Sequence, residues 1–109
     1  KLHNKIIDQA LQMVGLSHKK RAIVRNLSGG EKQRIGIARA IVTNPDIILA
    51  DEPCGNLDSE NEGHIVRMLK ELAHEKGYLV IVVTHNPEIV KQCDVRIKMK
   101  DGKIESISE

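Results

Sequence analysis

Two short apolar runs separated by a helical pattern constrain the fold of this chain most strongly. The first is Ile-Ile-Leu-Ala at 47–50, and the second is Leu-Val-Ile-Val-Val-Thr at 79–84. Continuous apolar runs of this length predict strands buried on both faces, as in parallel sheets. The segment between them predicts a helix. Strand, helix and strand in this order predict a parallel βαβ unit and therefore an α/β fold.

Helical patterns also precede this unit. Residues 4 to 14 place apolar side chains at helical spacing, and Gly15 is typical of a helix stop. Helices are expected from Ser28 to about 43 and from Ser59 to about 76, because each serine is followed three residues later by a glutamate, as in a capping box. The side chains expected to face inward on the first of these helices are Ile35, Ala38, Ile41 and Val42. Those expected on the second are Ile65, Leu69, Leu72 and Ala73.

The C-terminal part predicts a short helix and a hairpin. Asn86-Pro87 is typical of a helix start, and this helix is expected to end at about 92. Val95, Ile97 and Met99 alternate with charged residues before the turn signal Asp101-Gly102. The hairpin is therefore expected to place one face on the core.

Composition excludes several classes of function. The 109 residues are 40% apolar and 29% charged, which is typical of one small globular domain. With one Tyr, no Phe or Trp and a net charge of only +2, the chain has neither stacking residues nor a basic stripe, so no nucleic-acid binding is expected. Residues 17–25 predict a polar, basic connection. No apolar run approaches the roughly 20 residues of a membrane span, so no direct membrane insertion is expected.

Three polar residues follow the two expected strands. Asp51 and Glu52 come after the first strand, and His85 comes after the second. Parallel pairing places all three at the carboxyl edge of the sheet, where ligands bind. This set suits phosphoryl transfer to water: Asp51 can hold Mg²⁺, Glu52 can orient or deprotonate a water, and His85 can donate to a γ-phosphate oxygen.

A glycine-rich helix start adds a second phosphate-binding feature. Gly29 and Gly30 lie in the first turn after Ser28, and each costs roughly 1 kcal/mol relative to Ala. Glycine is used where a ligand must approach the backbone closely. The bare N–H groups of a helix start suit a phosphate anion.

Four motifs together resemble those of the ATP-binding-cassette (ABC) ATPases. Leu-Ser-Gly-Gly-Glu-Lys-Gln-Arg at 27–34 resembles the signature motif, and residues 47–53 resemble the Walker B segment. Gly-Asn-Leu-Asp at 55–58 resembles the D-loop, and residues 82–85 resemble the switch-histidine segment. The form Asp-Glu-Pro-x-Gly-Asn-Leu-Asp-Ser is similar to the branch of macrolide and antimicrobial-peptide exporters and lipoprotein-release transporters. Cys54 stands where that branch usually has Thr. It is either a tolerated residue of similar size or a reactive thiol.

The resemblance implies a function for each motif residue. Ser28, Gly29 and Gly30, with Gln33 on the same helix, would contact ATP held by a partner domain. Asp51 would bind Mg²⁺, Glu52 would be the general base, Asp58 would couple the two sites of a dimer, and His85 would sense the γ-phosphate. The implied partners are a second nucleotide-binding domain and a transmembrane permease subunit. The implied activity is ATP hydrolysis coupled to export, at the cytoplasmic face of the cell membrane.

The sequence holds no G-x-x-x-x-G-K-[ST] phosphate-binding loop (P-loop, or Walker A). We therefore expect the C-terminal part of an ABC-type P-loop NTPase domain. Residues 1–45 would form the end of the helical subdomain with the signature helix, and residues 46–109 would carry the Walker B, D-loop, switch-histidine and hairpin segments. We expect this chain alone neither to bind ATP tightly nor to hydrolyse it, and its open sheet edge to favour association.

Three alternatives stay open. The first is the ABC-type lobe of a chromosome-maintenance or DNA-repair ATPase, although no long heptad stretch is present. The second is a metal-dependent hydrolase built on Asp51, Glu52, Asp58 and His85, although no typical ligand spacing supports it. The third is a non-catalytic interaction fragment. The residues present identify neither a transported substrate nor a permease.

Overall fold

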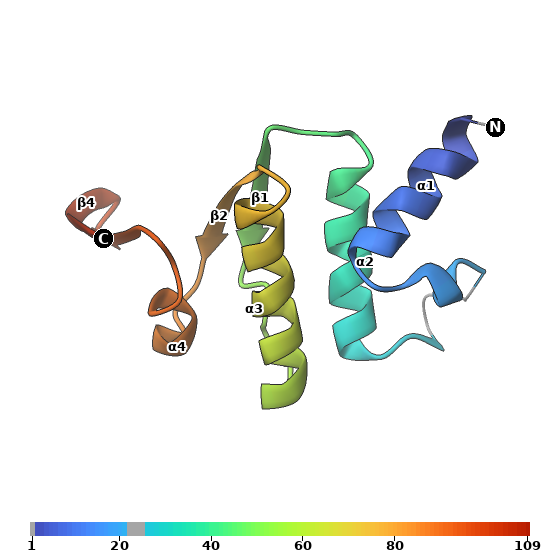
Figure 1. Cartoon of the computed structure of the whole chain (residues 1–109). Coiled ribbons are helices and arrows are strands. Elements are labelled where there is room, and N and C mark those ends of the chain that lie inside the picture. The colour runs from blue at the N-terminus through green and yellow to red at the C-terminus, as the bar shows by residue number, and fades with distance from the viewer. Residues whose placement is uncertain (1, 22–25) are drawn as a thin grey trace.

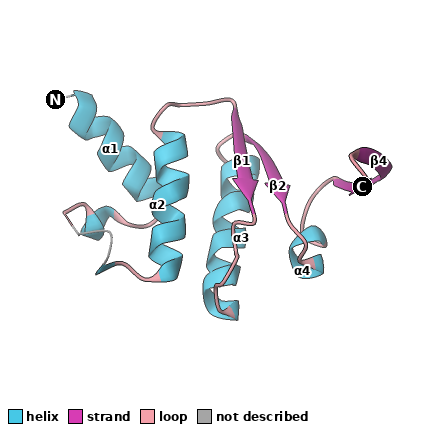
Figure 2. Ribbon diagram, turned by 180° about the vertical axis from the view of Figure 1, so that it is seen from behind, coloured by secondary structure: helices cyan, strands magenta, loops and turns pink. Residues whose placement is uncertain are grey.

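A parallel βαβ unit lies at the centre of the molecule (Figure 1). The computed structural model describes residues 2–21 and 26–109. The elements are α1 (Leu2–Met13), a short 3₁₀ helix η1 (Ser17–Lys19), α2 (Gly29–Ile41), β1 (Ile47–Asp51), α3 (Ser59–His74), β2 (Leu79–Val83), α4 (Pro87–Val90), β3 (Arg96–Lys100) and β4 (Lys103–Ser108). Helices α1 and α2 lie on one side of the unit, and the hairpin of β3 and β4 lies on the other (Figure 2).

The predicted βαβ unit is confirmed. Strands β1 and β2 pair in parallel, with Ile47 opposite Leu79 and Asp51 opposite Val83. Helix α3 connects them and packs against the sheet. The carboxyl ends of both strands therefore meet at one edge, which we call the carboxyl edge.

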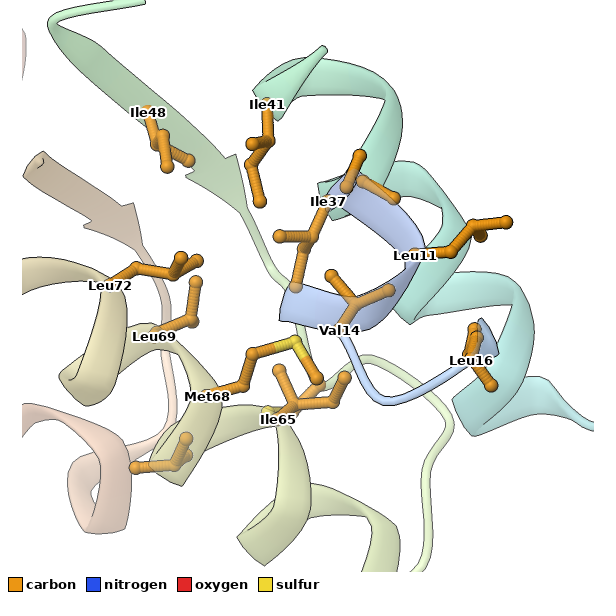
Figure 3. Close-up of a cluster of buried hydrophobic side chains, with 14 of the residues drawn as sticks. Leu11, Val14, Leu16, Ile37, Ile41, Ile48, Ile65, Met68, Leu69 and Leu72 are labelled. Carbon is orange, nitrogen blue, oxygen red and sulfur yellow. The ribbon is translucent and has the colours of Figure 1, made fainter. Parts of the chain in front are cut away.

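The core lies between α1, α2, α3 and the sheet face that these helices cover (Figure 3). Leu16, Ile65 and Leu72 are among its fully buried side chains. Helix α2 contributes Ile37, which the spacing argument missed, while Ile35 and Val42 are only half-buried. The reason is that α2 contacts α1 as well as α3, so its buried surface turns toward both neighbours.

The prediction that both strands are buried on two faces is wrong. Ile48 is 3% exposed, whereas its neighbours Ile47 and Leu49 are 52% and 69% exposed. Successive strand residues point to opposite faces, and in the described residues the helices cover only one face. Ile47, Leu49, Leu79, Ile81 and Val83 form the other face, which we call the open face.

The hairpin forms as predicted, but its placement on the core is wrong. Strands β3 and β4 pair antiparallel, yet Ile97, Met99 and Ile107 are exposed. Two hydrogen bonds hold the base of the hairpin instead. The Arg96 guanidinium donates to the carbonyls of Val90 and Lys91, each at 3.0 Å.

Helix ends differ by a few residues from those expected. The first residue of α3 is Ser59, but its N-cap is Asp58, which accepts from the Asn61 N–H at 2.8 Å. Helix α3 ends at His74 before Gly77, whose φ of +81° suits glycine. Helix α2 ends two residues earlier than expected, and so does α4. The expected connection at 17–25 begins with η1, and residues 22–25 lie outside the described residues.

The open face predicts self-association. We expect sedimentation velocity to show dimers as the concentration of this chain rises, because contact would remove the exposed side chains of Leu49 and Ile81 from water. Leu49→Thr with Ile81→Thr should raise the dissociation constant roughly tenfold. Ile104→Thr on the hairpin is the matched control. A monomer at all concentrations, or equal weakening by the control, would contradict the prediction.

Candidate functional site

The carboxyl edge brings together the three polar residues that follow the strands. Asp51 is the last residue of β1, Glu52 follows it, and His85 lies two residues beyond β2. The Glu52 N–H donates to the Val83 carbonyl at 2.7 Å, so the strand pairing continues one residue past β1. The convergence expected from a parallel pair is therefore present.

The loop after β2 holds the Glu52 carboxylate by both oxygens. Oε1 accepts from the His85 N–H at 2.9 Å, and Oε2 accepts from the Thr84 hydroxyl at 3.3 Å. The Glu52 backbone is left-handed, with φ of +47°, which is uncommon outside glycine and typical of strained functional positions. These contacts direct the carboxylate toward the loop that carries His85.

His85 extends into solvent beside this carboxylate. Its side chain is fully exposed, and Nε2 lies 3.8 Å from Glu52 Oε1. An open hollow of about 320 Å³ adjoins both side chains and is also lined by Cys54, Gly55, Asn86 and Ile89. A carboxylate and an imidazole thus lie at the same open site.

The start of α2 has the capping box that the spacing predicts. Ser28 Oγ accepts from the Glu31 N–H at 3.1 Å, and Glu31 Oε1 accepts from the Ser28 N–H at 3.0 Å. The Ser28 N–H and the nearby Lys19 ammonium lower the pKa of Glu31. The cap therefore favours the ionised form of Glu31.

Gly30 has a packing role that the sequence did not indicate. A Cβ at Gly30 would lie 2.5 Å from Oδ1 of Asn61 on α3, and a Cβ at Gly29 would lie 3.4 Å from Leu57. Gly30 is buried and Gly29 is exposed. The start of α2 therefore contacts the start of α3, and Gly30 permits this close approach.

The structure does not bring Ser28, Gly29 and Gly30 into the hollow beside Glu52. The segment at 55–58 lies between the two features, because Gly55 lines the hollow while Leu57 approaches Gly29. The chain therefore presents two separate surfaces, one at the start of α2 and one at the carboxyl edge.

The remaining candidates, Asp58 and Gln33, lie outside the hollow beside Glu52. Asp58 accepts the N-cap bond of α3. Gln33 is half-buried on α2, and within the described ranges its side chain makes no hydrogen bond. Asn86 begins α4 as predicted, and its side chain caps that helix. The contacts of Thr84 and Asn86 at the site were not predicted, although a hydroxyl and an amide on either side of His85 are a usable signal.

The acids at the carboxyl edge do not form a protein-only metal site. Over residues 2–21 and 26–109, no group of three or more His, Cys, Asp or Glu side chains is placed to hold a metal ion. Asp51 remains an exposed carboxylate at the strand end. A single carboxylate fits Mg²⁺, which keeps several waters and binds phosphate oxygens, whereas the metal-dependent hydrolase finds no support.

Cys54 is buried, which disfavours a reactive thiol. Its Sγ–H donates to the Glu62 carbonyl at 3.8 Å. Burial raises the pKa of Cys54 from its ordinary value of 9.0 to about 11, and the Glu62 and Glu52 carboxylates add to the rise.

We expect iodoacetamide at pH 8 to alkylate Cys54 about 100-fold more slowly in the folded chain than in urea, because the thiolate is the nucleophile. A Cys93→Ser variant isolates this thiol. The unfolded thiol ionises first as pH rises, so stability should fall between about pH 9 and pH 11. Equal rates in the folded and unfolded chain would refute the assignment.

Among residues 2–21 and 26–109, none of the helices has the length and apolar character of a membrane span.

The family model for ABC transporters matches residues 2–55. Lipoprotein-releasing system ATP-binding protein LolD of Shewanella sp. (strain MR-4) is 41% identical over 99 residues, which are 91% of this chain and 43% of the relative. LolD 1 of Rhodopseudomonas palustris is 39% identical over 97 residues, covering 89% of this chain and 43% of the relative.

Solved structures agree with these matches. The dimeric structure of MJ0796, a bacterial ABC transporter cassette, is 40% identical with a TM-score of 0.80, over 96% of this chain and 46% of that one. The structure of cbiO1 from Clostridium perfringens, part of the transporter complex cbiONQ, is 34% identical with a TM-score of 0.88, over 95% of this chain and 42% of that one. This chain thus spans less than half the length of the relatives it matches. The resemblance inferred from the four motifs is confirmed.

Proposed function

Because the chain belongs to the ABC transporter ATP-binding family, we propose that it is the signature and Walker B portion of a subunit that hydrolyses ATP to drive transport. One observation carries the proposal. The Glu52 carboxylate is held beside the exposed His85 by the Thr84 hydroxyl and the His85 N–H. A pre-positioned base at an open strand edge suits attack of water on a γ-phosphate.

Each residue has a definite task in this proposal. Glu52 takes a proton from the water whose oxygen attacks the γ-phosphorus, and ADP leaves. His85 donates to a γ-phosphate oxygen. Asp51 would hold Mg²⁺, and the bound ion would neutralise charge on the phosphates. The proposal assigns no step to Cys54, whose buried thiol makes a hydrogen bond to the Glu62 carbonyl.

The surface at the start of α2 meets a second ATP. Ser28, Gly29 and Gly30, with Gln33 on the same helix, would contact a γ-phosphate held by another nucleotide-binding domain, since none of them lines the hollow beside Glu52. Asp58, at the start of α3, would lie between the two sites. MJ0796 is described as dimeric, which supports this arrangement.

The LolD relatives belong to lipoprotein-releasing systems, which favours release of lipoproteins as the transport process. The membrane partner would be a permease, as the resemblance to ABC ATPases implies. The cbiO1 structure, described as part of a transporter complex, supports a partner of this kind. Such a subunit would lie at the cytoplasmic face of the membrane. The relatives named above belong to transporters, which favours this function over a chromosome-maintenance ATPase.

A chimera tests the proposal. Residues 2–109 would replace the matching segment of MJ0796, so that the cassette retains the part of that protein that this chain does not cover. We expect this chimera to hydrolyse ATP with Mg²⁺, while the 109-residue chain alone shows no turnover because the sequence lacks a P-loop. Free phosphate release measures both rates.

Two results would contradict the proposal. One is a folded chimera that binds ATP but releases no phosphate above background. The other is robust turnover by the 109-residue chain alone, because ATP would then be held by residues other than those assigned.

A further inference from the structure

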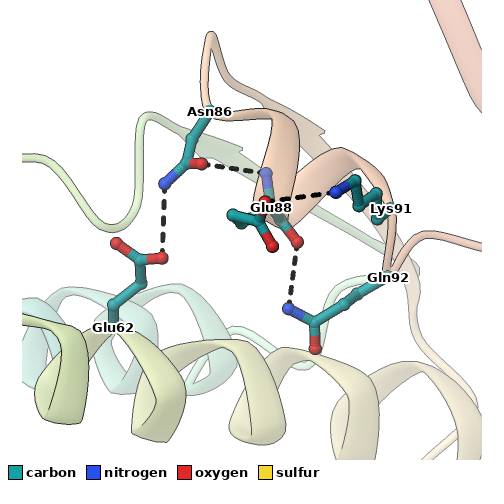
Figure 4. Close-up of polar contacts among 5 residues, drawn as sticks. All are labelled: Glu62, Asn86, Glu88, Lys91 and Gln92. Carbon is teal, nitrogen blue, oxygen red and sulfur yellow. Dashed lines mark hydrogen bonds and ion pairs between the residues drawn. The ribbon is translucent and has the colours of Figure 1, made fainter.

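The Asn86 side chain makes two hydrogen bonds at the junction of β2, α3 and α4 (Figure 4). Its Nδ2 donates to Glu62 Oε1 on α3 at 3.2 Å. Its Oδ1 accepts from the Glu88 N–H at 2.9 Å and so caps α4. The Asn86 backbone N–H donates to the Thr84 hydroxyl at 3.0 Å. One side chain therefore ties the loop after β2 to two helices.

This set of bonds leads to the Glu52 carboxylate. The Thr84 hydroxyl that accepts from Asn86 also donates to Glu52 Oε2 at 3.3 Å. His85 lies between Thr84 and Asn86 and donates its N–H to Glu52 Oε1. Both ends of the segment that contacts Glu52 are therefore fixed, one by strand β2 and the other by Asn86.

An amide is the side chain that these contacts require. Glu62 presents an acceptor and the Glu88 N–H presents a donor to the same residue, and an amide meets both at once through separate nitrogen and oxygen atoms. An aspartate at 86 would keep the cap but place two carboxylates together. Glu62 is half-buried, so screening of that repulsion by water is reduced.

We propose that Asn86 is a positioning residue. The hydrogen bond from its side-chain amide to Glu62 fixes the loop that holds Glu52 and His85 for reaction. That the loop serves ATP hydrolysis rests on the proposed function. The hydrogen bonds themselves are contacts within this chain and do not depend on it. It predicts that reversing the polarity of the 62–86 hydrogen bond preserves the loop, whereas removing the bond does not.

The experiment uses the His85 amide proton as its reporter. In a nitrogen-15 spectrum of the 109-residue chain, Asn86→Asp is expected to speed exchange of this proton about tenfold and to shift its resonance upfield, because the bond to Glu52 is weakened. Glu62→Gln alone should change little, since the Gln oxygen still accepts from Asn86. Glu62→Gln combined with Asn86→Asp should restore the reporter, because the Gln amide then donates to Asp.

The matched control is Lys91→Ala. It removes the 3.2 Å contact of Lys91 with Glu88 on the same short helix without touching the 62–86 bond. The control should leave the His85 amide unchanged. If it moves the reporter as far as Asn86→Asp does, the effect belongs to α4 in general and the proposal is wrong.

Two further results would overturn the proposal. One is an unchanged His85 amide in a folded Asn86→Asp chain. The other is failure of the added Glu62→Gln change to restore the reporter, or to restore folding where Asn86→Asp unfolds the chain. This experiment contains no nucleotide, so its outcome is independent of the chimera assay. Failure of one proposal can therefore be distinguished from failure of the other.

Discussion

Replacing Glu52 with Gln is expected to lower the turnover number for ATP about 100- to 10,000-fold, the usual contribution of a general base. The assay is steady-state phosphate release by the chimera of residues 2–109 with MJ0796. Gln has nearly the same shape as Glu and still accepts the His85 N–H through its oxygen. It loses the acceptor for the Thr84 hydroxyl, whose bond to Glu52 is long at 3.3 Å. The loss therefore reports the missing base more than a disturbed loop.

The matched control for this substitution is Glu88→Gln. Glu88 lies on α4 near the same loop, but its carboxylate is largely exposed and contacts only Lys91 among the described side chains. Its turnover should stay within about twofold of the parent chimera. Retention of a third or more of the turnover by Glu52→Gln would remove Glu52 from the proposed role.

The arrangement of the carboxyl edge followed from elementary strand geometry. Two apolar runs with a helix between them require a parallel pair, and a parallel pair places the residues after both strands at one edge. Glu52 and His85 could therefore be brought together from their positions in the chain. The Ser28–Glu31 cap could be predicted for a similar reason, since its two partners are three residues apart.

Contacts between distant segments could not be predicted in this way. The approach of Gly30 to Asn61 depends on how the starts of α2 and α3 meet. The bond between Asn86 and Glu62 joins residues 24 apart. Neither pair has a periodic or local pattern, because both arise only when helices dock in three dimensions. The capping box expected at Ser59 failed for a local reason, since Asp58 one residue earlier accepts the bond instead.

The open face shows the limit of periodicity most clearly. Ile48 and Leu49 are adjacent in an unbroken apolar run, which predicts that both side chains are buried. In the structure Ile48 belongs to the core, whereas Leu49 points to the face that the described helices do not cover. Which face is covered depends on the elements that pack against the sheet, and an apolar run carries no information about them.

Ile48→Ala and Leu49→Ala are therefore expected to differ sharply. Removing Ile48 leaves a cavity among packed side chains, which costs about 2–5 kcal/mol of unfolding free energy. For a domain of this size, that loss corresponds to a fall of roughly 10–30 °C in Tm. Leu49→Ala should cost less than about 1 kcal/mol, because its side chain is 69% exposed and only strand propensity is reduced. Thermal unfolding by circular dichroism, at a concentration low enough to keep the chain monomeric, measures both. Equal losses would mean that both faces of the sheet are covered in solution, and the open face would then have to be abandoned.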